Sequence, residues 1–554
     1  MLTPRLRYAA FAAIAALIVP TAVVSAQKSA DAALARKMNT FSAIINELQQ
    51  NYVDSIDIDK TFDAAINTMM YTIDPYTEYY NVEERKNFET MTTGEFGGIG
   101  SSILYRDGAT YISGPFEGSP AARAGLRAGD EILRVDTTST RGMTSDQVVS
   151  MMRGTPGTSV TLQVKRPYVT DSILSFTFDR ALVKSPSVPY YGMVADGIGY
   201  ITLTQYIEKS ADEVKAAIEA LTRNAPLRGI VLDLRGNGGG LLEAAIDILG
   251  YFLPKGTEVL RTRGKKEERI FKTTHRPLLE NVPLVVLIDN GSASSSEVTA
   301  GAIQDLDRGV LAGSRSFGKG LVQTTRPLPY NELIKYTTAK YYIPSGRLIQ
   351  ALDYSHRDAN GYATRTPDSL TNVFHTRAGR EVRDGGGLKP DVEIDWGEGN
   401  RLIYNLVRDN WIFDYANRYA NTHDTICAPE EFVITDEIYE DFKQFIDPER
   451  FKYDKVCEEG INNLRKTAEV EGYMNDDISR QFDELAKALT HDLQSDLDLK
   501  REEISEYLAM EIVEHYYYAR GQHIQFLKTD EGVKTAIEIL NDPKRYKELL
   551  SAKK

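Results

Sequence analysis

Cysteine is scarce in this chain of 554 residues, which contains only Cys427 and Cys457. A structural zinc site needs four ligands, and no close Cys/His cluster surrounds these two residues, so they do not predict a zinc site by themselves. Two alternatives stay open for them, a disulfide or two unpaired buried thiols. Because no cysteine lies near the start of the chain to carry a lipid, the sequence does not predict a lipoprotein.

Positive charge is in deficit, since 65 lysines and arginines stand against 79 aspartates and glutamates and the formal net charge is −14. A surface this acidic repels phosphate, so nucleic acid is not expected as a partner. With 42% hydrophobic and 26% charged residues the composition is that of an ordinary globular protein. The length suits about three or four domains.

Long hydrophobic runs are absent beyond the first 26 residues. There, Arg5 and Arg7 precede an apolar run that ends in small residues, which is typical of a secretory signal peptide with a cleavage site at residues 24–26 (VSA). The sequence therefore predicts an exported protein of the periplasm or cell envelope. The alternative is an uncleaved signal that anchors the chain, although the run is short for a membrane span and contains Pro20.

A hydroxyl is missing where a nucleotide-binding loop would need one. Residues 313–320, GSRSFGKG, come within one residue of the pattern G-x-x-x-x-G-K-[ST], but Gly320 stands where a serine or threonine would hold Mg²⁺. An exported protein also has little ATP to use. No nucleotide is expected, so Lys319 needs another role.

Changes in apolar spacing, glycine content and turn signals along the chain predict five segments. These are a signal peptide at 1–26, an N-terminal helical region at 27–88, a domain at 89–183, a core at 184–395 and a C-terminal helical domain at 396–554. We expect the last domain to act in assembly or substrate access and the N-terminal helices to be candidates for dimerisation. Apolar residues at helical spacing, expected to be core, are Ile478, Phe482, Leu485 and Leu489, followed by Ile504, Leu508 and Ile512.

The domain at 89–183 contains the pattern EGSPAARAGLRAGDEILRVD at residues 117–136. Ser119 caps a helix that Pro120 opens and Gly125 ends, and a strand follows at 131–135. Together with a helix at 144–154 and a strand at 158–166, this pattern resembles a PDZ domain. The resemblance implies that a glycine-rich loop binds a peptide's terminal carboxylate and that a helix around Val148 lines the groove. The loop residues are Gly97, Gly98, Ile99 and Gly100. A tight turn without a ligand is the alternative for these glycines.

Strands and helices alternate in the core segment, which predicts an α/β layer with functional loops at the strand ends. LDLRGNGGG leads from a buried strand into a glycine-rich loop and a helix, and residues 282–305 repeat this plan with a strand at 284–288. Ser294 and Glu297 fit the capping box S-x-x-E, so Ser294 should stand at a helix N-terminus. A serine there is exposed beside unpaired N–H groups that can stabilise an oxyanion. The alternative is that the serine-rich loop merely caps the helix.

Lys319 follows a short strand at 309–313 that can return the chain to the edge where Ser294 lies. A lysine can act as the general base for a serine once burial favours its neutral form. Its pKa must then fall by about three units from about 10.4, which buried sites achieve. Gln323, four residues later, is placed to orient the amine by a neutral hydrogen bond.

With these residues assembled, the chain resembles the carboxyl-terminal processing peptidases, exported serine proteases with a Ser/Lys dyad and an inserted PDZ domain. The resemblance spans residues 35–395 and depends on the PDZ pattern and on the stretches LDLRGNGGG, GSASSSEVTAGAIQD, SRSFGKGLVQ, TTAKYYIPSGRLIQ and GLKPDVEI. It implies Ser294 as nucleophile, Lys319 as general base and Gln323 as the residue that orients the lysine. It also implies the backbone N–H groups of Gly240 and Ser295 as oxyanion donors. Because the family usually has alanine at position 295, which of the consecutive serines attacks stays open.

The resemblance implies a multidomain α/β protein that hydrolyses proteins or peptides with exposed C-termini through an acyl-enzyme, with no metal or other cofactor. Peripheral membrane association and a homodimer stay open. A Ser/His/Asp arrangement is the internal rival, and it is disfavoured because no histidine lies between His275 and His356. The rival from another class is an inactive PDZ scaffold that binds protein tails, against which the intact Ser294, Lys319 and Gln323 argue.

Overall fold

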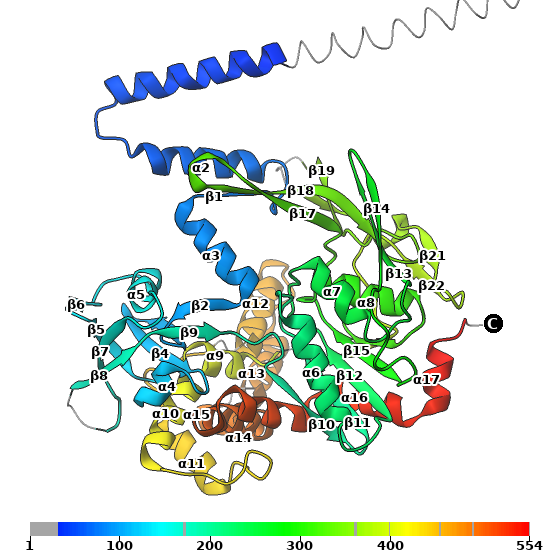
Figure 1. Ribbon diagram of the computed structural model, residues 1–554. Coiled ribbons are helices and arrows are strands. Elements are labelled where there is room, and N and C mark those ends of the chain that lie inside the picture. The colour runs from blue at the N-terminus through cyan, green and yellow to red at the C-terminus, as the bar shows by residue number, and fades with distance from the viewer. Residues whose placement is uncertain are drawn as a thin grey trace, which may run out of the picture. The chain divides into compact units, whose positions relative to one another are not determined.

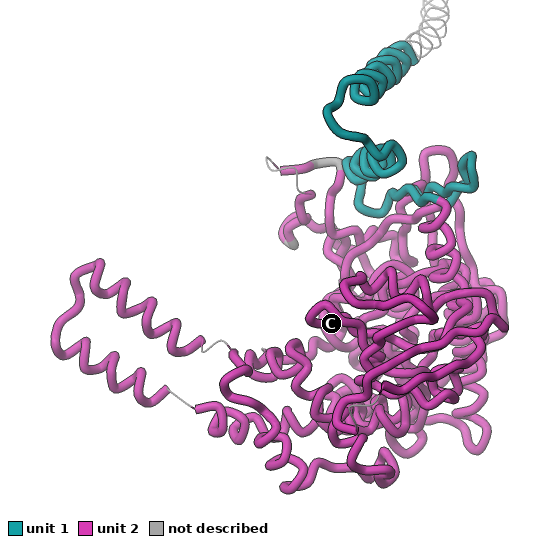
Figure 2. The backbone as a smooth tube through the Cα atoms, turned by 90° about the vertical axis from the view of Figure 1, so that its left-hand side faces the viewer, with its two compact units in different colours: residues 1–81, 325–336 teal, residues 82–324, 337–554 magenta. Residues whose placement is uncertain are grey.

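The computed structural model describes residues 31–169, 173–358, 363–397, 399–453, 456–489 and 492–552. The chain forms two compact units, which Figure 2 colours separately: residues 1–81 with 325–336, and residues 82–324 with 337–554. The predicted signal peptide at 1–26 lies outside the described residues. In the described part of the chain, no helix is both long and apolar enough to cross a membrane.

The first unit contains the helices expected near the N-terminus, at residues 31–51 and in α2 (Ile58–Tyr71). The Asp57 side chain caps α2 by accepting a hydrogen bond from the Lys60 N–H at 3.2 Å. Strand β1 (Glu78–Tyr80) lies where the sequence predicted more helix, and it pairs antiparallel with residues 333–335 of β18 (Leu333–Tyr342). The helical prediction was therefore right at residues 31–51 and in α2 and wrong at β1, and the predicted region is helical again from residue 82 to its boundary at 88.

The region that resembles a PDZ domain, called the PDZ region below, begins after helix α3 (Val82–Thr93), which runs across the predicted boundary at 88. Its elements are β2 (Glu95–Gly98), β3 (Ser101–Arg106), β4 (Ala109–Pro115), α4 (Pro120–Ala124), β5 (Glu131–Val135), β6 (Thr138–Ser139), α5 (Ser145–Met152), β7 (Ser159–Lys165), β8 (Ile173–Asp179) and β9 (Ala181–Lys184). The sheet has the order β3-β4-β5-β7-β8, and β2 pairs with β9. The predicted caps of α4 are confirmed, because Ser119 accepts from the Ala122 N–H and Gly125 is left-handed with φ 89°.

The second sheet forms the centre of the predicted core segment and has the order β10-β11-β12-β15-β16-β23. Figure 1 labels its strands β10, β11, β12 and β15. Its strands are β10 (Tyr190–Ala195), β11 (Ile198–Thr202), β12 (Gly229–Asp233), β15 (Leu284–Ile288), β16 (Val310–Gly313) and β23 (Val392–Glu393). Within this sheet, each strand from β11 through β12, β15 and β16 to β23 is parallel to its neighbour. Strand β10 is an edge strand that pairs antiparallel with β11. The apolar runs predicted as buried strands are confirmed, since every residue of β12 and β15 is buried.

Helices cover both faces of this sheet. Ile230 and Leu232 of β12 pack with residues of α6 (Ser210–Thr222), α7 (Leu242–Leu249) and α8 (Ser295–Asp305). Because successive strand residues point to opposite faces, Val231 packs on the other side, against α16 (Glu531–Asn541). A C-terminal helix thus completes the α/β layers of the core.

Further strands surround the core sheet. They are β13 (Glu258–Gly264), β14 (Glu268–Lys272), β17 (Leu321–Pro327), β19 (Leu352–Arg357), β20 (Ala363–Arg365), β21 (Val373–His375) and β22 (Glu381–Arg383), with short 3₁₀ turns at Pro329–Asn331 and Asp368–Leu370. Strand β13 pairs antiparallel with β14 and with residues 339–342 of β18.

The C-terminal region is helical, as predicted. Its helices are α9 (Arg401–Arg408), α10 (Trp411–Thr422), α11 (Asp436–Phe445), α12 (Val456–Val470), α13 (Asp476–Leu489), α14 (Leu493–Leu499), α15 (Arg501–Thr529), α16 and α17 (Pro543–Leu549). The stripe Ile504, Leu508 and Ile512 of α15 is fully buried, which confirms it as core.

Two expectations for this region were wrong. Helix α13 has no fully buried residue, and Leu485 is 46% exposed, because α13 lies beside α12 in a hairpin (Figure 2) rather than inside a bundle. Periodicity identifies an apolar face but not whether anything covers it. Cys427 and Cys457 are unpaired and exposed, so they form neither the disulfide nor the buried thiols that were considered.

Candidate active site

Ser294 stands at the turn between β15 and α8, where the sequence predicts it. Its backbone has φ 55° and ψ −115°, a conformation that residues with a side chain rarely adopt. Its N–H donates to Glu297 Oε2 at 3.0 Å, which is the glutamate half of the predicted capping box. Strained backbone of this kind is held only where the surroundings over-determine it, and it is common at functional sites.

The three consecutive serines differ in exposure and in their hydrogen bonds. Ser295 is 2% exposed and its hydroxyl donates to the Gly240 carbonyl at 2.8 Å, while the fully buried Ser296 donates to the Asn237 carbonyl at 2.8 Å. Ser294 is partly exposed. The hydroxyls of Ser295 and Ser296 therefore hold the neighbouring loop, and Ser294 is the one that a substrate can reach.

Lys319 lies in the loop that follows β16, the strand parallel to β15. Its backbone N–H donates to Glu297 Oε2 at 2.9 Å, the same oxygen that accepts from Ser294. The Tyr341 hydroxyl lies between the carbonyl oxygens of the two residues, 3.3 Å from that of Ser294 and in a short hydrogen bond with that of Lys319. The structure thus brings the backbones of Ser294 and Lys319 together.

Glu297 has a larger part in this site than the cap that its spacing predicted. The side chain is fully buried, and Oε1 accepts from the Ser316 hydroxyl at 2.6 Å and the Gly318 N–H at 2.8 Å. Burial raises the pKa of Glu297 to about 7, although all four hydrogen bonds favour the charged form. The S-x-x-E spacing pointed to this residue, but nothing local linked it to Lys319.

The glycine-rich loop that follows β12 lies directly against Ser294. A Cβ on Gly239 would stand 2.8 Å from the Ser294 Cβ and 2.9 Å from the Ser295 nitrogen, and one on Gly240 would stand 2.1 Å from the Tyr206 carbonyl oxygen. Both glycines have positive φ, 96° and 143°. Within the described residues neither the Gly240 N–H nor the Ser295 N–H has an acceptor, and the two residues are joined by the Ser295 hydroxyl. These are the two predicted oxyanion donors.

The loop is fixed by polar contacts that sequence reasoning did not find. The Asn237 amide donates to the Leu203 carbonyl at 2.7 Å, and the Asn237 carbonyl accepts from the Ala293 N–H at 3.0 Å. The Gly236 N–H donates to Asp289 Oδ1 at 2.9 Å. Residues at the ends of β12 and β15 therefore hold one another, as expected at the carboxyl edge of adjacent parallel strands.

Gln323 is on β17, four residues after Lys319. Its Nε2 donates to Thr337 Oγ1 of β18 at 3.1 Å. The proposed orientation of the Lys319 amine by Gln323 stays a prediction. Among the described side chains no histidine makes a hydrogen bond to Ser294, so the geometry offers no support for the Ser/His/Asp rival.

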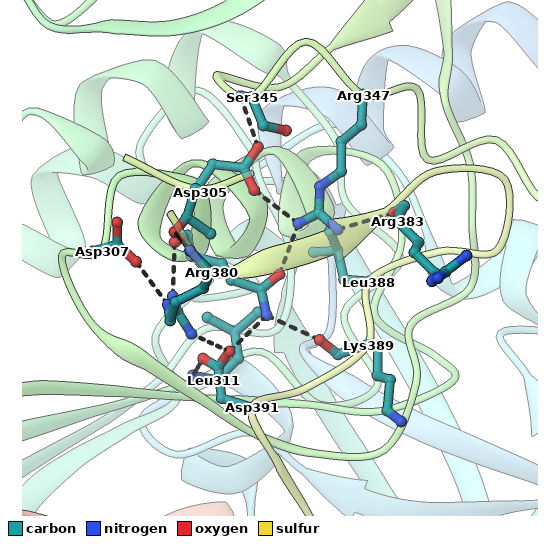
Figure 3. Close-up of polar contacts among 12 residues, drawn as sticks. Asp305, Asp307, Leu311, Ser345, Arg347, Arg380, Arg383, Leu388, Lys389 and Asp391 are labelled. Atoms are coloured by element: carbon teal, nitrogen blue, oxygen red, sulfur yellow. Dashed lines mark hydrogen bonds and ion pairs between the residues drawn. The ribbon is translucent and has the colours of Figure 1, made fainter. Parts of the chain in front are cut away.

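The opposite end of α8 is held by a buried charge cluster (Figure 3). Arg347 is 2% exposed, and its Nη2 donates to Asp305 Oδ1 at 2.8 Å and to Gln304 Oε1 at 2.7 Å. The second carboxylate oxygen of Asp305 accepts from the Ser345 N–H at 2.9 Å. Beside it, Arg380 forms ion pairs with Asp307 and Asp391. The helix that presents Ser294 is thereby anchored at its far end.

Of the predicted peptide-binding residues, Gly97 is half-buried, and Gly98, Ile99, Gly100 and Val148 are buried. Gly97 and Gly98 belong to β2, and a Cβ on Gly97 would stand 2.1 Å from the Gly154 carbonyl oxygen. Val148 is fully buried in the PDZ core, where Ile99 also lies. In this structure Val148 thus lies on the face of α5 that points into the core, and its expected place in an apolar groove for peptide side chains stays a prediction.

Gly100 is also in close contact with neighbouring residues. A Cβ on this residue would stand 2.4 Å from the Ser119 Cβ, and its φ of 74° also suits glycine. Close packing therefore explains the glycines of this segment in the present structure. The described residues contain no group of three or more His, Cys, Asp or Glu side chains that could hold a metal ion.

Comparison with known families gives three matches. Residues 111–166 match the family described as PDZ domain, residues 197–354 match Peptidase family S41, and residues 402–540 match Probable PDZ-protease, C-terminal helical domain. The fold and these matches define a serine-type peptidase with a PDZ domain, an S41 protease core and a C-terminal helical domain. The predicted multidomain α/β fold class is confirmed.

Relatives place the chain within that class. It is 36% identical to the carboxy-terminal-processing protease of Bartonella bacilliformis over 66% of this chain and 83% of that protein. It is 32% identical to the carboxy-terminal processing protease CtpA of Bacillus subtilis over 61% of this chain and 72% of that one. The chain belongs to the carboxyl-terminal processing protease family.

Among solved structures, the photosystem II D1 C-terminal processing protease is 26% identical to this chain. The likeness covers 64% of this chain and 86% of that one, with a TM-score of 0.35. The family assignment therefore depends on the sequence relatives.

Proposed function

We propose that the protein is an exported endopeptidase that cleaves polypeptides through a Ser294/Lys319 dyad without a cofactor, and that its PDZ domain selects substrates by their C-termini. One observation carries the catalytic part of this proposal. The backbone N–H groups of Ser294 and Lys319 converge on a single oxygen of Glu297, so the two residues are held side by side. The inserted PDZ domain supports the binding of peptide tails, the usual ligands of that domain.

Acylation begins with attack of the Ser294 Oγ on the carbonyl carbon of the scissile peptide bond. The neutral Lys319 Nζ takes the hydroxyl proton, and Gln323 orients the amine. The carbonyl oxygen gains the negative charge and accepts hydrogen bonds from the N–H groups of Gly240 and Ser295, which have no acceptor among the described residues.

The intermediate then collapses. The C–N bond breaks, Lys319 gives its proton to the leaving amine, and the new N-terminus departs, which leaves the acyl group as an ester on Ser294. A water molecule attacks the ester while the neutral Lys319 takes one of its protons. When the second tetrahedral intermediate breaks down, Lys319 returns this proton to Ser294 Oγ, and the product leaves as a carboxylic acid that loses its remaining proton to solvent.

The test of the dyad uses an unfolded, fluorescently labelled protein as substrate. Ser294→Ala should abolish cleavage, because the other serines of this turn, Ser292, Ser295 and Ser296, are buried. Ser295→Ala is the matched control, since it keeps the backbone N–H and removes only the hydroxyl that binds the Gly240 carbonyl. Full activity of Ser294→Ala, or loss of activity in Ser295→Ala alone, would overturn the choice of nucleophile.

Two further experiments test the predicted absence of a cofactor and the predicted export. Activity should be unchanged by a metal chelator. Mass spectrometry of the protein from fractionated cells should find it outside the cytoplasm with an N-terminus after residue 26. A cytoplasmic protein that begins at residue 1 would contradict export. A purified wild type that binds tails but cleaves nothing would favour the scaffold alternative.

A further inference from the structure

The junction of α15 and α16 in the C-terminal region contacts the segment that leads into the glycine-rich loop. Asp530 lies at this junction and caps α16 by accepting a hydrogen bond from the Val533 N–H at 2.8 Å. Its two carboxylate oxygens also accept from Arg235, with Nη1 at 2.8 Å and Nη2 at 3.0 Å. Two parallel, charge-assisted hydrogen bonds of this kind are stronger and more directional than a single neutral one.

Arg235 is held on its other edge as well. Asp233, at the end of β12, accepts from Arg235 Nε at 3.0 Å and Nη2 at 2.6 Å, and it receives the Tyr200 hydroxyl at 2.7 Å. The rings of Trp396 and Phe526 lie 5.3 and 5.5 Å from the guanidinium carbon. The guanidinium therefore has fixed partners at both edges and aromatic rings beside it.

Little solvent reaches this cluster. The side chain of Arg235 is 13% exposed, and those of Asp233 and Asp530 are each 6% exposed. Burial opposes the charge of Arg235, but the carboxylates of Asp233 and Asp530 outweigh it and raise the pKa of Arg235. The pair is thus charged and is weakly screened by solvent.

The position of Arg235 connects this cluster to the proposed chemistry. The next residue is Gly236, and the loop continues to Gly240, the proposed oxyanion donor. On the side of β15 the loop is fixed by Asp289 and Asn237 contacts. On the other side the Arg235 side chain contacts Asp233, at the end of β12, and Asp530, in the C-terminal helical region.

We propose that Asp530 is a positioning residue for the peptidase reaction, which acts through Arg235 to hold the glycine-rich loop in register with Ser294. The inference rests on the proposed function of that loop as the oxyanion site. It assigns the C-terminal helical region a part in catalysis, because the active site is complete only when the junction of α15 and α16 is docked. Asp530 itself touches no reacting atom.

The main test compares Asp530→Asn with Asp542→Asn in the full-length protein. Asp542 caps α17 in the same way, through the N–H groups of Lys544 and Arg545, but is exposed and has no arginine partner in the core. Asparagine caps helices as well as aspartate does, so both variants keep their caps. The two substitutions therefore differ mainly in the ion pair that one of them removes.

We expect Asp530→Asn to lower kcat about 10- to 100-fold on a quenched fluorescent peptide, with KM changed less than about twofold, since a displaced oxyanion donor affects the transition state more than binding. Asp542→Asn should match the wild type. A kcat for Asp530→Asn within twofold of wild type, corrected for the folded fraction by circular dichroism, would overturn the proposal.

A double-mutant cycle tests the route through Arg235. Adding Asp530→Asn to Arg235→Gln should change kcat less than about twofold, because the residue through which Asp530 acts is already lost. An equal loss in both backgrounds would mean that Asp530 acts by another path and would overturn the inference.

Two measurements keep the test open if Asp530→Asn folds poorly or if the proposed function fails. Gly532→Ala keeps every charge but sets a methyl group 2.9 Å from Arg235 Nη1, so it should lower kcat in a folded protein. Hydrogen exchange of the amides at 236–240 should speed up in Asp530→Asn, whatever the activity. Activity in Ser294→Ala would refute the proposed function alone, whereas unchanged exchange in Asp530→Asn would refute the coupling alone.

Discussion

Replacing Glu297 by glutamine removes a buried charge while keeping the shape of the side chain. The carboxylate accepts four hydrogen bonds, two on each oxygen. The introduced amide would keep its oxygen toward Ser294 and Lys319 and turn its NH₂ toward Ser316, whose hydroxyl can accept. In that orientation one backbone donor, the Gly318 N–H, loses its partner, at a cost of about 1–3 kcal/mol.

The charge itself gives the larger and pH-dependent effect. A pKa raised by burial from the ordinary 4.5 to about 7 corresponds to about 3 kcal/mol between the two protonation states. Because the folded protein binds the proton more tightly than the unfolded chain, wild-type stability falls as the pH rises from 4.5 to above 7. Glu297→Gln has no such loss, so its stability relative to the wild type should improve by about 3 kcal/mol between pH 4.5 and pH 8.

The assay is urea-induced unfolding at a series of pH values, followed by circular dichroism. Glu243→Gln is the matched control, because Glu243 is in the first turn of α7 as Glu297 is in that of α8, yet is exposed. The Glu243→Gln series measures what the same exchange does at an exposed first-turn position. A difference for Glu297→Gln that is flat with pH, or that runs the other way, would refute the reasoning that burial outweighs the four hydrogen bonds.

Three other predictions concern catalysis, stability and binding. Lys319→Ala should abolish cleavage while Gln323→Ala lowers it less, and wild-type activity should rise with pH as the Lys319 amine becomes neutral; equal losses in the two variants would contradict these roles. Arg347→Met should destabilise the protein by about 3–5 kcal/mol because Asp305 stays buried without its partner, and Arg347→Met/Asp305→Leu should recover part of this loss in urea titrations; an unchanged single variant would contradict it. In calorimetric titrations of Ser294→Ala, a peptide with a free apolar C-terminus should bind more tightly than its amidated twin, and equal affinities would rule out carboxylate recognition.

Local patterns were predictable where the interacting residues are close in the sequence. The cap at Ser119 and the stop at Gly125 depend on backbone groups within a few residues, and both formed as expected. The pattern at Ser294 and Glu297 was equally local. The stripe that includes Leu485 was not predictable as core, because burial there depends on a partner that the stripe does not encode.

The sequence by itself determined which chemical groups are available and which turn presents them. The glycine-rich loop of LDLRGNGGG, the serines after β15 and the loop with Lys319 each follow a strand, and turns at strand ends are set by nearby residues. The sequence also indicated an α/β layer, because its strands alternate with helices. Those features depend on backbone geometry over a few residues, which local composition controls.

Only the tertiary structure decided how these groups meet. The order β12-β15-β16 brings three loops to one edge of the sheet, and there Glu297 joins Ser294 to Lys319. The same packing sets α16 on the far face and lets Asp530 reach Arg235. Contacts between residues so far apart in the chain depend on which faces pack together, and that is fixed by the burial of whole surfaces rather than by any short pattern.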